Sequence, residues 1–301
     1  MNSQFQTLFQ SGNRNRPRIW LDSIAYANRL FAGGKQELWR DPTSIISVLS
    51  QAQGLLQSDV IHFPLHQVYT AWVETQSQEV ERWLGKRPTF ALKKLLASEV
   101  TRNIVIDVLK GMTIVNRDSK PLILSLGSPQ KWLQWMSEIV RPGEDPSISH
   151  DDVDSASMYL ADYLRTYSTT GISAIVLEEA VHPPIGLAEA IELYQPILNL
   201  AGHYQWSVGL SLAGESNQWT GINEHVDFTL FGESTIPPLF PYWQQGKAIG
   251  GGVNRAFWMR NEKVAGFKLP PEALLFGTIP EEANPEMVLE HLKELRQVAA
   301  H

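Results

Sequence analysis

The sequence has 301 residues, of which 43% are hydrophobic and 19% are charged, so the chain is long enough to bury one large core. Its formal net charge of −7 argues against nucleic acid or an anionic membrane as the main partner. The absence of cysteine excludes disulfides, thiolate zinc sites and a cysteine nucleophile. The polar N-terminal stretch is unlike a signal peptide, and no apolar run approaches the roughly 20 residues that cross a bilayer. We therefore expect a soluble, cytoplasmic protein.

Short apolar runs alternate with helical patterns along the whole chain, and neither an internal repeat nor a long linker divides it. The runs predict eight strands at 18–22, 59–63, 120–126, 173–177, 207–212, 226–231, 247–252 and 273–276. Apolar residues three or four apart predict helices at 43–56, 99–115, 130–140, 185–200 and 286–298, and one from Asp151 or Asp152 to about Tyr167. Alternation within 68–90 predicts a small hairpin or lid inserted after the second strand.

Eight strands that mostly alternate with helices predict an α/β protein: a single (β/α)₈ (TIM) barrel domain over residues 1–301. A doubly wound open sheet is the alternative. The sequence has no G-x-G-x-x-G after the first strand, which weakens a dinucleotide-binding interpretation.

Several motifs resemble those of one enzyme family. The segment Ile279-Pro-Glu-Glu-Ala-Asn-Pro-Glu-Met-Val288 is similar to I-L-P-E-T-P-P-E-N-V, the closing motif of the uroporphyrinogen decarboxylase family. Weaker matches follow in the family's order: Pro17–Leu21 to P-V-W-L, Gly127–Pro129 to G-A-P, Leu177-Glu178 to F-[DE], and Ala248–Asn254 to A-L-Q-G-N-L-D. The resemblance covers almost the whole chain. It points to the superfamily that also contains methionine-synthase-like and corrinoid methyltransferase barrels.

The resemblance implies a lyase that removes CO₂ from an organic acid without a redox cofactor, but the family's reactive positions differ here. The arginines of its M-R-Q-A-G-R segment are missing from 22–27, and its tyrosine and late histidine fall at Trp135 and Gly277. Its aspartate after strand two falls near Leu65, and its serine or threonine after F-[DE] becomes Glu179. We therefore do not expect uroporphyrinogen itself to be the substrate.

In such a barrel the chemistry lies where the strands end. The residues at those ends predict catalytic roles for Glu178, Glu179, His66 and Asp22, and substrate binding by Ser128, Glu215, Glu233, Asn254 and Arg255. Five carboxylates among them predict an acidic mouth, suited to a cationic, amine-bearing or hydroxylated ligand or to an oxygen-ligated metal ion. Only one of the adjacent Glu178 and Glu179 can face the barrel axis. We favour His66 over His62, which we expect to point away from the site or to be buried in its strand.

Three functions stay open at this point. The first is a decarboxylase-type lyase acting on a small organic substrate. The second is a methyltransferase, for which a corrinoid protein is a possible partner, and the third is a barrel that binds a small ligand without catalysis. The sequence assigns no metal site and no cofactor, although a metal ion or a corrinoid stays possible, as does a homodimer.

Overall fold

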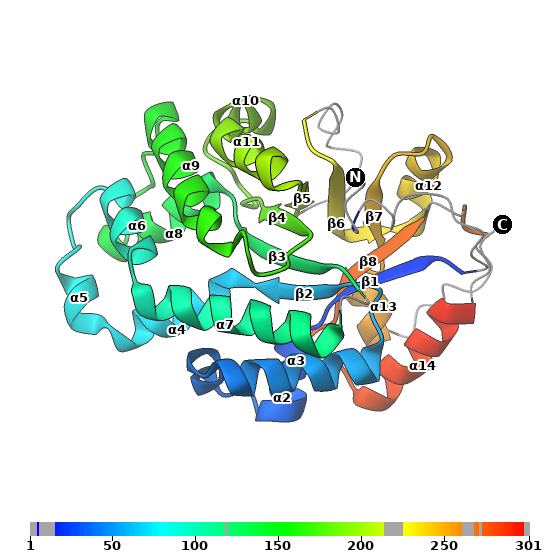
Figure 1. Ribbon diagram of the computed structural model, residues 1–301. Coiled ribbons are helices and arrows are strands. Elements are labelled where there is room, and N and C mark those ends of the chain that lie inside the picture. Colours follow the sequence, from blue (N-terminus) through cyan, green and yellow to red (C-terminus); the bar gives the residue numbers. More distant parts are fainter. Residues whose placement is uncertain are drawn as a thin grey trace.

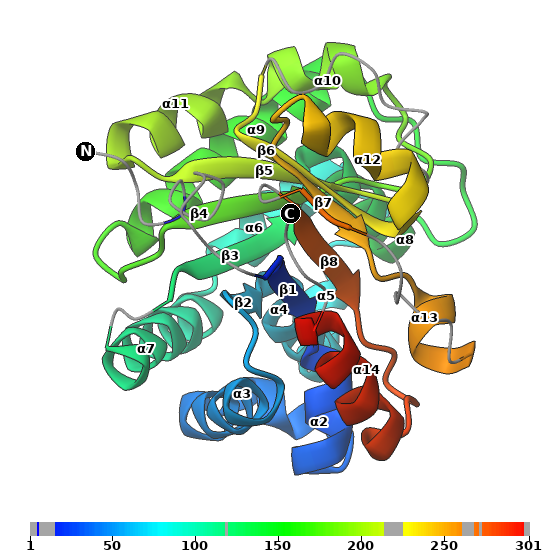
Figure 2. The ribbon, with the colours of Figure 1, turned by 90° about the vertical axis from the view of Figure 1, so that its right-hand side faces the viewer.

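The computed structural model describes residues 5, 16–117, 120–213, 225–260, 268–270 and 273–297. Eight parallel strands follow one another in the order β1-β8-β7-β6-β5-β4-β3-β2, and helices surround them (Figures 1 and 2). The strands are β1 (Arg18–Asp22), β2 (Ile61–Pro64), β3 (Leu122–Gly127), β4 (Ala174–Glu178), β5 (Ser207–Leu212), β6 (Phe228–Thr235), β7 (Ile249–Gly252) and β8 (Leu274–Thr278). The predicted (β/α)₈ barrel is confirmed, with β1 and β2 meeting at a nearly closed seam.

The helices between the strands largely follow the predicted pattern. They are α2 (Ile24–Ala32), α3 (Pro42–Leu56), α4 (Leu65–Thr75), α5 (Ser77–Glu81), α6 (Pro88–Leu96), α7 (Glu99–Asn116), α8 (Pro129–Val140), α9 (His150–Leu164), α10 (Leu187–Leu193), α11 (Gln195–Tyr204), α12 (Ile236–Gln244), α13 (Arg255–Arg260) and α14 (Pro285–Gln297). Two short 3₁₀ helices cover Gln36–Arg40 and Arg165–Tyr167. The N-cap of α9 is Ser149, which forms a capping box with Asp152, rather than either aspartate itself.

The insertion after the second strand is helical, so the predicted hairpin is wrong. The chain enters α4 directly after Pro64, and α4 buries Leu65, Val68, Tyr69 and Ala71. Most of these buried residues are three or four positions apart, which is the period of one helix face. In the sequence, the short alternation of apolar and polar residues around Tyr69 hides this period. Helices α5 and α6 then extend the insertion before α7.

The barrel interior is filled by side chains that alternate with outward-facing ones along each strand. Trp20, Val176, Leu230 and Phe276 belong to this inner cluster and are buried. Trp20 meets Phe276 edge to face, with ring centroids 5.6 Å apart. These apolar side chains form the floor beneath the carboxyl ends of the strands.

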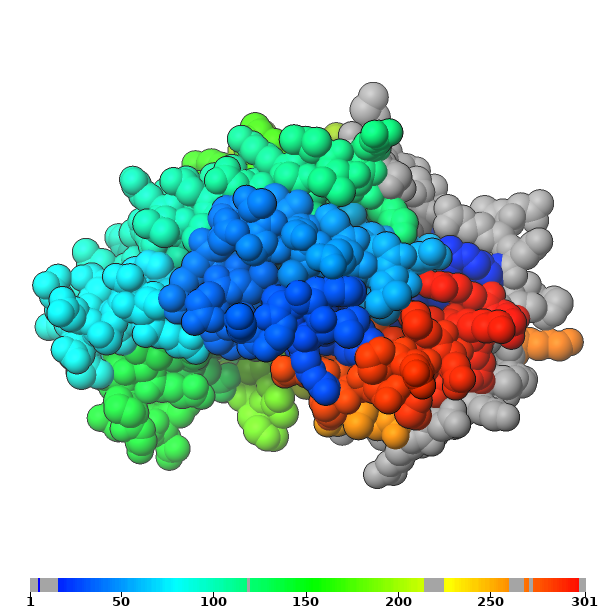
Figure 3. Space-filling model, turned by 90° about the horizontal axis from the view of Figure 1, so that it is seen from below, coloured from blue at the N-terminus to red at the C-terminus, as the bar shows by residue number. Residues whose placement is uncertain are grey.

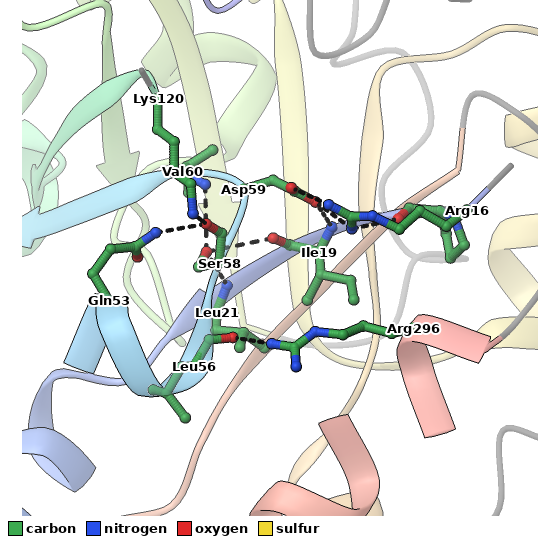
Figure 4. Close-up of polar contacts among 11 residues, drawn as sticks. Arg16, Ile19, Leu21, Gln53, Leu56, Ser58, Asp59, Val60, Lys120 and Arg296 are labelled. Atoms are coloured by element: carbon green, nitrogen blue, oxygen red, sulfur yellow. Dashed lines mark hydrogen bonds and ion pairs between the residues drawn. The ribbon is translucent and has the colours of Figure 1, made fainter. Parts of the chain in front are cut away.

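Side chains and single backbone bonds close the seam between β1 and β2 near the start of the strands (Figure 4). The Leu21 N–H donates to Ser58 Oγ at 3.2 Å, the Ile19 N–H donates to Asp59 Oδ2 at 2.8 Å, and the Asp59 N–H donates to the Ile19 carbonyl at 2.7 Å. The carboxylate of Asp59 also holds the Arg16 guanidinium at 2.8 Å. The hydrogen bonds of Ser58 and Asp59 therefore take the place of a regular β-ladder between β1 and β2.

The first and last parts of the chain lie next to each other at this seam. Helices α2, α3 and α14 share the face shown in Figure 3, where the blue and red segments adjoin. Arg296 of α14 donates to the Leu56 carbonyl at the end of α3 at 2.6 Å, and Arg29 of α2 donates to the Glu281 carbonyl at 2.8 Å. Within the described residues, no helix has the length and apolar character needed to cross a membrane.

Candidate active site

A cavity of about 280 Å³ opens where the strands end. Strand-end residues Asp22, Glu178 and Thr278 line it, together with His62, Ser125 and Lys131. Apolar side chains of the inner cluster form its floor. The polar groups therefore stand at the edge of a well-packed core, at the face where barrels of this type carry their sites.

Asp22 and His62 face each other across the β1–β2 seam. His62 Nδ1 lies 3.6 Å from Asp22 Oδ1, which is an ion pair rather than a normal hydrogen bond, and His62 Nε2 lies 2.7 Å from Ser125 Oγ. Burial lowers the pKa of His62, but the Asp22 carboxylate and the charge of Glu178 outweigh it and leave this pKa raised. Burial raises the pKa of Asp22, but His62, the Ile24 N–H and Thr278 outweigh it and leave that pKa lowered. The pair is thus held as a carboxylate beside an imidazole that keeps its proton to higher pH than usual.

Glu178 and Lys131 form the second charged pair of the cavity. Lys131, in the first turn of α8, places its Nζ 2.8 Å from Glu178 Oε2. Burial raises the pKa of Glu178, yet the charge and hydrogen bond of Lys131 outweigh it and leave this pKa lowered. Because an ammonium has three donors, Lys131 keeps donors for a ligand while it bonds Glu178.

Glu179 also belongs to the cavity lining, but its carboxylate is directed into a buried network behind this pair. Its carboxylate accepts hydrogen bonds from Ser128 Oγ at 2.6 Å, Tyr194 Oη at 2.8 Å and the Ala180 N–H at 2.9 Å. Burial raises the pKa of Glu179 despite these donors. The expectation that only one of the two glutamates faces the cavity axis agrees with this geometry, and Glu178 is the one.

Ser128 is a structural residue in this geometry and does not line the cavity. It is fully buried, it caps α8 by accepting the Lys131 N–H, and it donates to Glu179. Its predicted direct contact with a substrate is therefore not supported by its position.

His66 lies outside the main cavity, contrary to the prediction that it shares a cavity with Asp22. It belongs to the first turn of α4 because β2 already ends at Pro64. Its Nε2 lies 3.1 Å from Thr70 Oγ1, and its ring meets Trp135 edge to face at 4.7 Å. Burial and the charge of Lys131 lower the pKa of His66, so this imidazole is mainly neutral at pH 7.

The remaining predicted residues divide between cavity and periphery. Glu233 lines the main cavity. Asn254 accepts the Phe257 N–H at 3.0 Å and so acts at the start of α13. Arg255 pairs with Glu282 and is not among the residues that line the cavity, so its predicted contact with a substrate stays a prediction. Glu215 lies outside the described residues.

Sequence reasoning missed His62, Lys131, Ser125 and Thr278. The pattern of β2 contains the signal for His62: Val60 belongs to the inner cluster, while Ile61 and Phe63 belong to the layer between strands and helices. Strand alternation therefore turns His62 inward with Val60. Lys131 could have been found as a cation in the first turn of the helix that follows a strand end.

Gly277 shows why the family's late histidine has no counterpart here. A Cβ at Gly277 would stand 1.8 Å from the Val253 carbonyl oxygen, so any side chain at this position would collide with the backbone. The two segments approach each other too closely for a histidine, and the site is built from other residues.

The charge of the cavity is more balanced than the sequence predicts. Asp22, Glu178, Glu179 and Glu233 share the lining with Lys131 and with His62, and the carboxylate of Glu179 is bonded to internal donors. The described residues contain no group of three or more His, Asp or Glu side chains placed to hold a metal ion. The arrangement suits acid–base chemistry on a small polar molecule.

The sequence matches no protein-family model and no curated protein. Among solved structures, the chain is similar to a methyltransferase from Methanosarcina mazei, with a TM-score of 0.57, 11% identity and 98% of each chain covered. It also aligns with a type I 3-dehydroquinate dehydratase from Clostridium difficile over 96% of this chain and 97% of that one, with 15% identity and a TM-score of 0.45. A homocysteine methyltransferase from Escherichia coli aligns over 94% and 96%, with 12% identity and a TM-score of 0.37.

At these identities the likeness shows the fold alone, and the two alignments with TM-scores below 0.5 carry no argument. The Methanosarcina mazei barrel agrees with the fold that the motif resemblance implies. Membership of the uroporphyrinogen decarboxylase superfamily stays a prediction.

Proposed function

We propose that this barrel is a lyase that removes CO₂ from a small organic acid. The observation that carries the proposal is the Asp22–His62 pair, which faces the same cavity as Lys131. Such a site supplies a cation that positions the carboxylate and a proton for the carbon that loses CO₂, while the electron pair left on that carbon is stabilised by the substrate's own structure.

The reaction follows from the positions of these groups. Lys131, bonded to Glu178, directs its remaining donors to the substrate carboxylate. The bond between the carboxyl carbon and its neighbour breaks, and its electron pair stays on the neighbouring carbon. The Asp22–His62 pair delivers a proton to that carbon, and CO₂ leaves. The apolar floor around Trp20 excludes water and so protects the developing carbanion.

The test uses a panel of small acids labelled with ¹³C in the carboxyl group. Purified protein is incubated with each acid, and labelled CO₂ and bicarbonate are followed by NMR. We expect release from at least one acid, a loss of about 100-fold or more in H62Q, because a general acid contributes about 10²–10⁴, and a comparable loss in K131M. Release that persists in both variants would overturn the assignment of these residues.

The pH profile tests the role of Asp22. His62 must be protonated to act as the acid, so activity should persist near neutral pH and decline as pH rises through the raised pKa of His62. In D22N the carboxylate that raises this pKa is gone, so the decline should move to lower pH while the shape of the profile is kept. An unchanged profile in D22N would contradict the pairing.

Methyl transfer is the second candidate. The full-length likeness to a barrel named as a methyltransferase supports the fold that this reaction would use, and the same Asp22–His62 pair could serve as its base. A corrinoid protein would then be the partner, and no cysteine-based zinc site would take part. Transfer of a labelled methyl group from methylcobalamin to a small acceptor, without CO₂ release, would favour this candidate. Tight binding without either reaction would favour the non-catalytic alternative.

A further inference from the structure

A second cavity, of about 260 Å³, lies beside the first between α4, α8 and the loop after β4. Lys131 and Val181 belong to the lining of both cavities, so the two are neighbours on either side of the Lys131 side chain. A cavity of roughly 150 Å³ is enough to hold benzene, so this one has room for a ring. Nothing in the proposed reaction uses it.

The walls of the second cavity are aromatic. Trp132 and Trp135 lie with ring centroids 5.3 Å apart, and His66 stands edge-on to both at 6.1 Å and 4.7 Å. Trp132 is 2% exposed and held by the core, whereas Trp135 is only half-buried, so the latter offers ring surface to a ligand. Such planar, rigid walls bind planar groups well, because aromatic pairs gain energy beyond the area they bury.

The charges around the second cavity favour a neutral ring joined to an acid. The imidazole of His66 is mainly neutral, since burial and Lys131 both lower its pKa. The amide of Gln134 is already bonded to the His182 carbonyl at 2.8 Å. Two charged groups belong to the lining, the exposed carboxylate of Glu138 and the ammonium of Lys131. Lys131 stands at the junction with the first cavity, so the acid group of a ligand is attracted to that side of the ring.

We propose that the second cavity is the specificity pocket for a planar aromatic substituent of the substrate, and that the substrate class is therefore small carboxylic acids that carry an aromatic ring. The ring lies against Trp135 and His66, and the acid-bearing part of the molecule reaches past Lys131 at the junction into the first cavity, which Asp22 and His62 line. This inference rests on the proposed function for the acid end of the ligand, while the aromatic end depends on the second cavity alone.

The test measures binding to the full chain by calorimetry with three probes: benzoate, cyclohexanecarboxylate and acetate. Benzoate and cyclohexanecarboxylate have the same charge and similar size, and only benzoate is planar and aromatic. We expect benzoate to bind about tenfold more tightly than either of the others, which corresponds to about 1.4 kcal/mol. Benzylamine, with the opposite charge, should bind more weakly than benzoate.

Two variants locate the binding. In W135L the preference for benzoate over cyclohexanecarboxylate should disappear, while acetate binding is unchanged. The matched control is W72L, which removes a half-buried tryptophan that stacks on Trp83 away from both cavities and should keep the preference. H66L is a second variant at the pocket, to be used if W135L fails to fold. It should also reduce the preference for benzoate over cyclohexanecarboxylate.

The outcomes separate the two proposals. Equal binding of benzoate and cyclohexanecarboxylate, or a preference that survives in both W135L and H66L, overturns the aromatic pocket. A preference that W135L removes supports the pocket even if no acid is decarboxylated, in which case only the proposed reaction fails.

Discussion

The two adjacent glutamates at the end of β4 have different roles, although they are the same residue type. Glu178 keeps 27% of its side chain exposed and bonds Lys131 at the cavity, whereas Glu179 is 4% exposed and bonds three donors behind it. The difference follows from strand geometry, because successive side chains point to opposite sides. One carboxylate is therefore available to a ligand, and the other fixes the loop that carries it.

Exchange of each glutamate for glutamine should separate these tasks. In E179Q the amide offers one acceptor oxygen where the carboxylate had two, so the buried network loses at least one bond, at a cost of about 1–3 kcal/mol and about 2–6 °C in Tm. In E178Q the Tm should stay within a few degrees of the parent. The affinity for an acidic probe should rise severalfold, because the charge of Lys131 is no longer balanced by a carboxylate. Thermal scans and benzoate titrations of both variants check this. An E179Q protein as stable as the parent would contradict the structural role.

At the level of single residues, the sequence identifies strand ends but not the residues that point toward them from elsewhere. Asp22 and Glu178 could be predicted because each directly follows an apolar strand. The sequence favours His66 because it follows the predicted strand end, but α4 begins at Leu65 and carries His66 out of the main cavity, while alternation along β2 turns His62 inward. The position of Lys131 in the first turn after a strand end is visible in the sequence, but its 2.8 Å contact with Glu178 joins two elements that no local pattern relates.

At the level of elements, the β1–β2 seam is where the barrel depends on individual side chains. The strand pairs on either side of it share regular parallel ladders, whereas Ser58 Oγ bonds the Leu21 N–H and lies 3.4 Å from the Val60 N–H. Lys120 and Gln53 add bonds to the Ser58 carbonyl at 2.7 Å and 2.8 Å (Figure 4). A two-residue segment thus supplies the bonds that a ladder supplies elsewhere.

Removal of the Ser58 hydroxyl should destabilise the barrel. S58A leaves the buried Leu21 N–H without this acceptor, which costs about 1–3 kcal/mol and lowers the Tm by about 2–6 °C. The control is S50A, because Ser50 Oγ bonds only the Ile46 carbonyl one turn earlier in α3 and joins no two elements. Its Tm should stay within about 1–2 °C of the parent, as for most substitutions away from such features. Equal effects of S58A and S50A would show that the seam does not depend on this hydroxyl.

Elements were predicted best where a buried stripe is long and worst where helices are short. The helix predicted at 43–56 is α3, which begins at Pro42 with Asp41 as its N-cap, since the Asp41 carboxylate accepts the Ser44 N–H at 2.9 Å. The helix predicted at 185–200 divides at Tyr194 into α10 and α11, with a proline at the start of α11. In the insertion, the short α5 and α6 gave too few turns for a helical period to stand out.

At the level of the whole molecule, the last helix completes the barrel. Leu292 and Leu295 of α14 are fully buried in the layer between strands and helices, and Arg296 bonds the end of α3 beside the β1–β2 seam. Residues 240 positions apart therefore depend on each other for the closure of the barrel. The cavity lies at the opposite end of the same seam, where Asp22 meets His62.

Truncation of a buried leucine in α14 should therefore lower the stability of the strands along the whole seam. L292A removes a fully buried side chain and should lower the free energy of unfolding by about 2–5 kcal/mol. The matched control is L289A in the same helix, where the leucine is 43% exposed and the cost should be about 1 kcal/mol or less. Because α14 holds the seam through Arg296, hydrogen exchange should accelerate in L292A at β1 and β8 as well as in α14, and L289A should leave those strands protected. Exchange that accelerates in α14 alone would show that the seam closes without the last helix, and the link between α14 and the Asp22–His62 end of the barrel would be wrong.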